Sequence, residues 1–222
     1  MSLRLIERIW SYNCLIKEPA VLFENEIAAM LRHDPLAVFF TFAEAKDIFE
    51  NNFWANLTQN RLEKTKAWFK ENNKQSLIEE RKEYDELRAK IVAPRDISFA
   101  EFMSDSTTKE YLQKHLWWLV GTFYSQGISE PEKSKIQENL QAIPGVYCAQ
   151  MHQMAYFFYV NVKGNRPQTR GNNVDARHVV SAAHANVFVT DDEFLLNLLK
   201  SASAFWPFMP MGYSEFCERF PV

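Results

Sequence analysis

The stretch NNVDARHVVSAAHANVFVTDDEFLLNLL, Asn172 to Leu199, decides the fold that this sequence predicts. The asparagines at its start can cap a helix that holds Asp175 in its first turn. Residues 187–190, VFVT, then have the apolar composition of a buried strand. Asp191 and Asp192 follow the strand and precede a second helical pattern, EFLLNLLKSA. The stretch therefore predicts a helix, a strand and a helix in succession.

Carboxylates stand at both ends of the step from the first helix to the strand. Asp175 opens the helix and Asp192 follows the strand, while Val179, Ala182 and Ala183 give the helix a small apolar side that can face a sheet. Ligands of open parallel α/β sheets bind beyond the carboxyl ends of the strands, near the starts of helices. We therefore expect Asp175 and Asp192 to converge on one cleft.

This segment resembles the C-terminal half of the PIN-domain family of metal-dependent ribonucleases. In that family an acid opens a helix, and the following strand ends in Thr-x-Asp. Here Asp175 is the first acid and Thr190-Asp191-Asp192 is the second element, with Asp192 in the final position and Asp191 in the variable one. The resemblance implies that these residues line a metal-dependent active site.

A second match to the same family lies earlier in the chain. The family has another strand that leads into a helix, with a Thr followed three residues later by Glu. Residues 37–49, AVFFTFAEAKDIF, supply this pattern with Thr41 and Glu44. The resemblance implies an α/β fold with a short, mainly parallel sheet flanked by helices. We expect a single PIN-like domain over residues 1–222, with a large helical insertion at about 54–145.

The resemblance also implies the chemistry of the site. Carboxylates held close together repel one another unless a cation neutralises them, and oxygen ligands suit Mg²⁺ or Mn²⁺. Such an ion can activate water for hydrolysis of a phosphodiester, which predicts a ribonuclease, including a toxin-like one with an inhibitory protein partner. Glu44, Asp175 and Asp192 are the expected catalytic ligands, with Asp191 as a further metal acid and Thr190 in support. A basic loop and the helix beside it supply the residues expected to contact RNA phosphates, which are Lys163, Arg166, Arg170 and Arg177.

One element of the family pattern is missing. The family begins with a strand that carries an Asp, whereas residues 1–17 and 21–30 have the periodicity of amphipathic helices. Either the chain is shortened at its N-terminus or one metal ligand has been lost, and the second case predicts a non-catalytic scaffold that binds RNA or a protein partner. Glu24, Glu26 and Asp34 are possible substitutes, although acids at such positions are usually solvated. A third hypothesis is that the matched acids are only helix caps on an unrelated helical fold.

Composition excludes several other classes of protein. The chain has 222 residues, a formal net charge of −3 and three cysteines, which form neither a disulfide framework nor a thiolate zinc site. No apolar run is long enough to cross a membrane, and we expect a cytoplasmic protein. His178 and His184 lie six residues apart, on different faces of a helix, which argues against a zinc site with Asp175.

The remaining segments predict mainly helices. Ser98 and Ser129 each precede a Glu by three residues, which is the spacing of a capping box, and residues 107–124 form an apolar helical run. Residues 147–162, YCAQMHQMAYFFYVNV, fit either a helix throughout or a helix that leads into a strand. The aromatic tail at 205–220 can pack over the core or bind a partner, and we expect Ser214 to cap its last helix.

Overall fold

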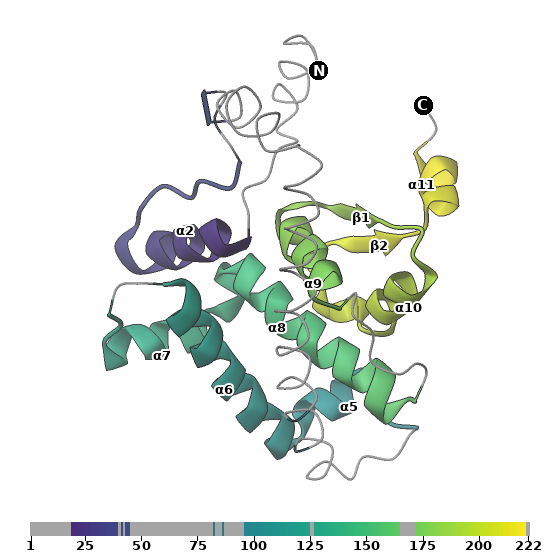
Figure 1. The fold of residues 1–222 in the computed structure, drawn as a ribbon, viewed down its shortest axis with the longest axis horizontal. Coiled ribbons are helices and arrows are strands. Elements are labelled where there is room, and N and C mark those ends of the chain that lie inside the picture. Colours follow the sequence, from purple (N-terminus) through teal and green to yellow (C-terminus); the bar gives the residue numbers. More distant parts are fainter. Residues whose placement is uncertain are drawn as a thin grey trace, which may run out of the picture. The chain divides into compact units, whose positions relative to one another are not determined.

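The computed structural model describes residues 19–39, 41, 43–44, 82, 86, 96–124, 127–164 and 172–220 (Figure 1). The chain divides into two compact units, one made of residues 1–17 and 37–85 and the other of residues 18–36 and 86–222. Nearly all of the described residues belong to the second unit. Most of residues 54–95, the first half of the predicted insertion, lie outside the described residues, so the prediction of one domain with an insertion stays a prediction.

The second unit is mostly helical and contains a small parallel sheet. Its elements are α2 (Pro19–Arg32), α5 (Phe99–Ser104), α6 (Ser106–Phe123), α7 (Glu130–Glu138), η2 (Leu140–Ala142), α8 (Pro144–Phe157), η3 (Phe158–Val162), α9 (Asn172–Ser181), η4 (Ala182–His184), β1 (Val187–Val189), α10 (Glu193–Ser201), η5 (Ser203–Phe205), β2 (Met209–Met211) and α11 (Tyr213–Arg219). The coarse prediction of helices around a parallel sheet is confirmed.

The helix α8 forms the centre of this unit (Figure 1). Ten of its 14 residues are buried, and it packs against α2, α6, α9 and α10. A helix that is apolar on every side belongs in a core, which explains why its periodicity alone did not distinguish helix from strand. The chain continues from α8 into the π-helical turn η3, so residues 147–162 are helical throughout. Rings from Phe99, Phe102 and Phe158 pack together against the end of α8.

Side chains set the start of three helices, two of them at the predicted capping boxes. Ser98 and Glu101 form a capping box before α5, and Ser129 and Glu132 form one before α7. Asp105 caps α6 by accepting hydrogen bonds from the backbone N–H groups of Thr107 and Thr108. Each cap satisfies N–H groups that have no partner within their own helix.

The sheet has two strands, β1 and β2, which are joined through α10 and pair in parallel. The N–H of Met209 donates to the carbonyl of Asn186, and the N–H of Thr190 donates to the carbonyl of Met211. The prediction of a strand at 187–190 is thus confirmed, but the strand ends at Val189 and is only half-buried. Val179 of α9 and Ala182 and Ala183 of η4 are buried as expected, but α9 and η4 pack chiefly against the helix α8, where we had expected a sheet.

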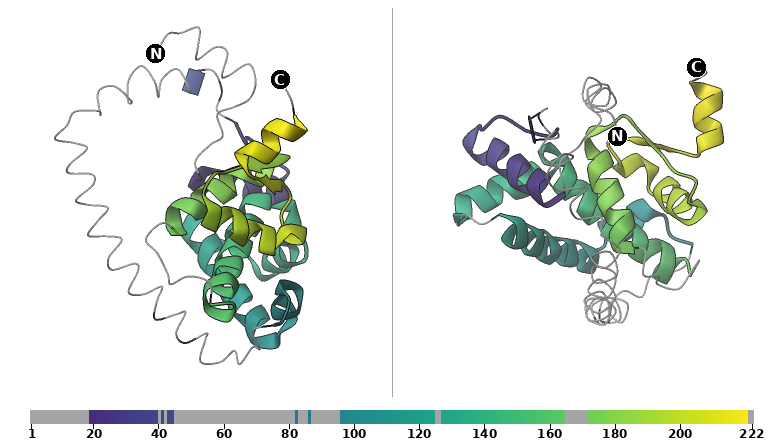
Figure 2. Two further views of the ribbon diagram at one scale, coloured as in Figure 1. Left: turned by 90° about the vertical axis from the view of Figure 1, so that its right-hand side faces the viewer. Right: turned by 45° about the horizontal axis from the view of Figure 1, so that its top comes forward.

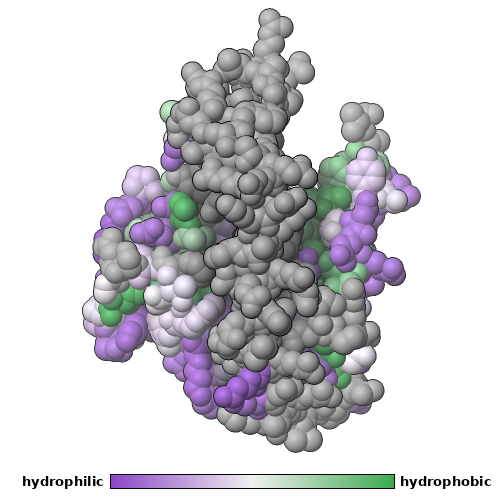
Figure 3. Space-filling model, in the orientation of Figure 1, coloured by the Kyte–Doolittle hydropathy of each residue, from purple (hydrophilic) through white to green (hydrophobic). Residues whose placement is uncertain are grey.

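The C-terminal helix α11 projects from the end of the second unit that carries the sheet (Figures 1 and 2). None of its seven residues is buried, although Trp206 and Phe208 earlier in the tail are. Gly212, and not Ser214, occupies its N-cap position, so that prediction is wrong. Figure 3, in the same orientation as Figure 1, shows apolar surface beside strongly hydrophilic surface in the region of β2 and α11.

Candidate functional site

The candidate site begins at the carboxyl end of β1, where Thr190, Asp191 and Asp192 follow the strand. Asp192 is the N-cap of α10, because its Oδ1 accepts the N–H of Leu195 at 3.0 Å. The hydroxyl of Thr190 accepts the N–H of Asp192 at 3.1 Å. Asp191 reaches a different helix, since its Oδ1 accepts the N–H of Tyr213, the first residue of α11, at 3.2 Å. The two adjacent carboxylates therefore diverge toward two helix starts.

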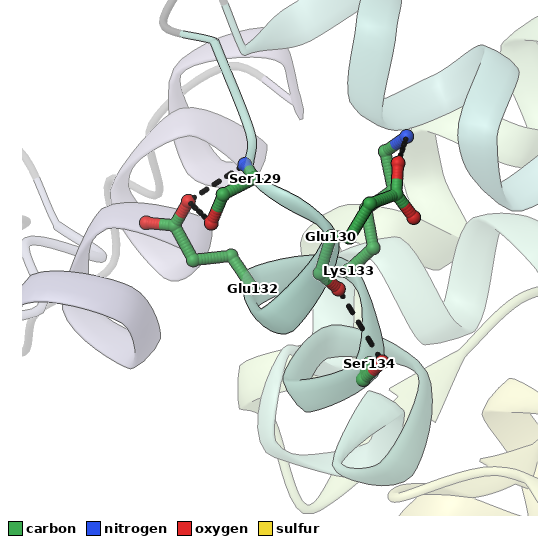
Figure 4. A network of polar contacts seen from close by, with 5 residues as sticks. All are labelled: Ser129, Glu130, Glu132, Lys133 and Ser134. Atoms are coloured by element: carbon green, nitrogen blue, oxygen red, sulfur yellow. Dashed lines mark hydrogen bonds and ion pairs between the residues drawn. The ribbon is translucent and has the colours of Figure 1, made fainter.

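Glu44 also has the geometry of a helix cap. Its Oε2 lies 2.7 Å from the backbone nitrogen and 2.8 Å from the hydroxyl of Thr41, and the Glu44 N–H donates back to that hydroxyl at 3.3 Å. The same reciprocal bonds join Ser98 and Glu101 before α5. Before α7, the N–H and the hydroxyl of Ser129 both donate to the carboxylate of Glu132 (Figure 4). The spacing of Thr and Glu that matches the ribonuclease family is thus also the spacing of a capping box.

The predicted metal acids differ in their surroundings. Asp191, Asp192 and Glu44 are exposed, whereas Asp175 is partly buried in the first turn of α9. Glu44 belongs to the first unit and the three aspartates to the second. Among the described residues, no group of three or more His, Cys, Asp or Glu side chains could hold a metal ion. The Mg²⁺ or Mn²⁺ site therefore stays a prediction.

The predicted phosphate contacts are described only in part. Lys163 follows η3, donates from Nζ to the carbonyl of Ile97 at 2.7 Å, and lies over the ring of Phe158. Arg177 is exposed on α9. Arg166 and Arg170 lie outside the described residues.

A buried ionic centre, which the sequence did not predict, joins three elements of the second unit. Glu26 of α2 is 1% exposed, so its interpretation as a solvated residue is wrong, while Glu24 and Asp34 are exposed as expected. Its carboxylate accepts the N–H of Gly145 at 2.8 Å and that of Val146 at 3.3 Å. These groups belong to the first turn of α8, whose own N-cap residue makes no side-chain bond. Glu26 thus caps α8 from a distant part of the chain, where the helix dipole also favours an anion.

His184 completes this centre. Its Nε2 lies 2.7 Å from Oε1 of Glu26, and its side chain is 12% exposed. An ionised carboxylate can only accept hydrogen bonds, so Nε2 of His184 is the donor. The position of Glu26 on α2 gives a signal that could have found the centre, since it falls within the apolar stripe of Leu22, Phe23 and Ile27.

The chemistry available around this centre is limited by burial. Burial and the negative charge of Glu26 raise the pKa of the Cys148 thiol, which is fully buried and stays protonated at neutral pH. Burial lowers the pKa of His152 to about 4, so its ring is neutral. The ring of His115 on α6 is partly buried, and burial lowers its pKa to about 4 as well. These groups are structural, because the carboxylate, the thiol and the His152 ring are closed to solvent.

Comparisons of the chain with family models, with curated proteins and with solved structures find no match. Within the described ranges, no helix combines the length and apolar content that a membrane crossing requires. A functional proposal therefore depends on the geometry of the described side chains.

Proposed function

We propose that this chain is a PIN-like scaffold that works by binding a protein partner, without hydrolysing a phosphodiester. One observation carries this proposal: the adjacent acids Asp191 and Asp192 point toward the starts of two different helices. A metal-dependent hydrolase needs carboxylates that converge on a shared ion. Here each carboxylate instead accepts a backbone N–H, which fixes its direction. Glu44 has the same kind of bond with Thr41.

The PIN-like part of the proposal is supported by the order of elements around the sheet. A helix with an acid in its first turn, α9, precedes β1, and β1 leads through the Thr-Asp-Asp segment into α10. The parallel pairing of β1 with β2 is the arrangement expected of an α/β protein.

A metal-dependent ribonuclease is the second candidate, and the position of its acids favours it. Asp191 and Asp192 follow the carboxyl end of a parallel strand, which is where α/β proteins bind ligands. In this case Asp175 and Asp192 would hold Mg²⁺ or Mn²⁺, and RNA would be the substrate.

Titration with Mn²⁺ by calorimetry separates the two candidates. The variant Asp175→Asn/Asp192→Asn removes two charges, and Asn at position 192 can still cap α10 because Asn and Asp cap helices about equally well. The matched control is Asp105→Asn, which alters the N-cap of α6, an aspartate with a similar cap geometry outside the candidate site.

The binding scaffold predicts no saturable Mn²⁺ binding by the parent chain or by either variant. Saturable binding that is lost in the double variant and kept in Asp105→Asn would overturn the proposal in favour of the ribonuclease. Far-UV circular dichroism of each variant verifies that the helices are intact.

A further inference from the structure

An apolar surface lies across the sheet and α11 at the C-terminal end of the second unit. Val189 and Met209 are 37% and 42% exposed, and Tyr213 and Phe220 are 59% and 44% exposed. The register of β1 and β2 pairs Val187 with Met209 and Val189 with Met211, so Val189 and Met209 point to the same side of the sheet. We call Val189, Met209, Tyr213, Phe216 and Phe220 the α11 surface.

Contacts with neighbouring elements hold α11 beside the sheet. The N–H of Tyr213 donates to Asp191, and Nζ of Lys200 lies 3.0 Å from the carboxylate of Glu215. At the other end of the helix, Nη1 of Arg219 lies 3.0 Å from the sulfur of Met209, the first residue of β2. These contacts join α11 to the segment after β1, to α10 and to β2.

The α11 helix is short and amphipathic. Tyr213 and Phe216 lie three residues apart on one side of the helix, and Phe220 follows its last residue, with its ring 5.2 Å from that of Phe216. Helices below about 12 residues are marginal in water and depend on packing of their apolar side. Since no residue of α11 is buried, a partner that covers this side would stabilise the helix.

The charge around the α11 surface restricts the chemistry of that partner. Residues 186–220 contain five acids and two bases, and all five acids are exposed; they are Asp191, Asp192, Glu193, Glu215 and Glu218. Complementary charge steers association and suppresses partners of like charge. A polyanion such as RNA is repelled by this end of the molecule, and so is the same end of a second copy.

We propose that the α11 surface binds an amphipathic segment of a protein partner, with apolar residues on one side and Lys or Arg along its flanks. The inference rests on the proposed binding function and names the class of partner. Apolar side chains of the segment would cover Tyr213 and Phe220, and its basic flanks would face the surrounding carboxylates.

The first test uses designed peptides of about 18 residues, long enough to form a helix. A fluorescent Leu/Lys amphipathic peptide is titrated with the full chain, next to a Leu/Glu peptide and a scrambled Leu/Lys peptide of unchanged composition. We expect the amphipathic cationic peptide to bind at least about tenfold more tightly than either control. Equal binding of the scrambled peptide would refute the proposal, because charge alone would then account for the affinity.

Variants of the chain locate the binding site. Tyr213→Ser/Phe220→Ser is expected to weaken the cationic peptide by about tenfold or more, since central apolar anchors carry most of the binding energy. The matched control is Trp118→Ser, which removes another exposed aromatic side chain, 60% exposed on α6, and is expected to leave binding unchanged. Equal losses in the two variants would refute the α11 surface as the site. Both variants alter exposed positions, and an unchanged unfolding midpoint verifies that each is folded.

Further outcomes distinguish other occupants and the underlying proposal. Direct binding of a labelled oligoribonucleotide to the chain that Tyr213→Ser/Phe220→Ser weakens, or a dimer in sedimentation that the same variant dissociates, would overturn the assignment to a basic protein segment. If no peptide binds and the chain does not bind Mn²⁺, the role of the α11 surface is refuted and the proposed function is not. Saturable Mn²⁺ binding at the aspartates would instead contradict the proposed function.

Discussion

Removal of the Glu26 carboxylate is expected to destabilise the second unit strongly. Glu26→Ala leaves the buried N–H groups of Gly145 and Val146 without their acceptor and leaves His184, whose side chain is 12% exposed, without its partner. A buried polar group that loses its hydrogen-bond partner costs about 1–3 kcal/mol, and two N–H groups lose theirs here, so the expected total is about 2–6 kcal/mol. This loss is a large share of the roughly 5–15 kcal/mol that stabilises a typical domain.

Urea unfolding at neutral pH, followed by far-UV circular dichroism, measures this loss. Glu24→Ala is the matched control, because Glu24 is an exposed glutamate on the same helix, and we expect it to change stability by no more than about 0.5 kcal/mol. Glu26→Ala and His184→Ala should be non-additive by about 0.5–3 kcal/mol, since the two side chains are in contact. A loss below about 1 kcal/mol for Glu26→Ala would refute the role of the carboxylate as the cap of α8.

Two further predictions concern the same core. A Cβ at Gly145 would lie 2.9 Å from Oε1 of Glu26, so Gly145→Ala should lower the urea midpoint of unfolding. The control is Gly121→Ala in α6, where a Cβ would meet nothing within 4 Å, and it should raise the free energy of unfolding by about 0.5–1 kcal/mol. If both variants are stabilised, the steric clash at Gly145 is refuted. Burial lowers the pKa of His152 from 6.5 in the unfolded chain to about 4 in the folded chain. As pH falls, the unfolded chain therefore binds a proton before the folded chain does, which favours unfolding. The free energy of unfolding should fall by on the order of 3 kcal/mol between pH 6.5 and pH 4. Urea unfolding measured across this pH range should show that His152→Leu loses less stability than the parent chain. An identical loss of stability in the two chains would show that His152 does not cause the pH dependence.

Local signals in the sequence predicted several elements well. The capping boxes at Ser98 and Ser129 and the cap at Asp192 depend on residues within three positions of one another, so the order of residue types is enough to identify them. The strand β1 was recognisable because a short apolar, β-branched run stands between two helical patterns. By contrast, β2 contains Met209-Pro210-Met211, which has no strand propensity, and it exists because it pairs with β1.

The candidate acids show where a local pattern is ambiguous. Thr41 with Glu44, and Thr190 with Asp192, led us to predict a ribonuclease-like site, yet the same spacing forms helix caps. Whether two carboxylates converge on a metal or point to separate helices depends on where those helices start in space. The sequence contains no direct signal for that choice.

The sequence by itself determined where α5, α7 and α10 start and that one strand precedes Asp191, because these features depend on interactions between residues a few positions apart. The tertiary structure decided that Glu26 is buried against Gly145 and His184, residues more than a hundred positions away in the chain. It also decided that α11 leaves its apolar side exposed. Burial and charge pairing of this kind depend on the packing of distant segments, which local periodicity does not encode.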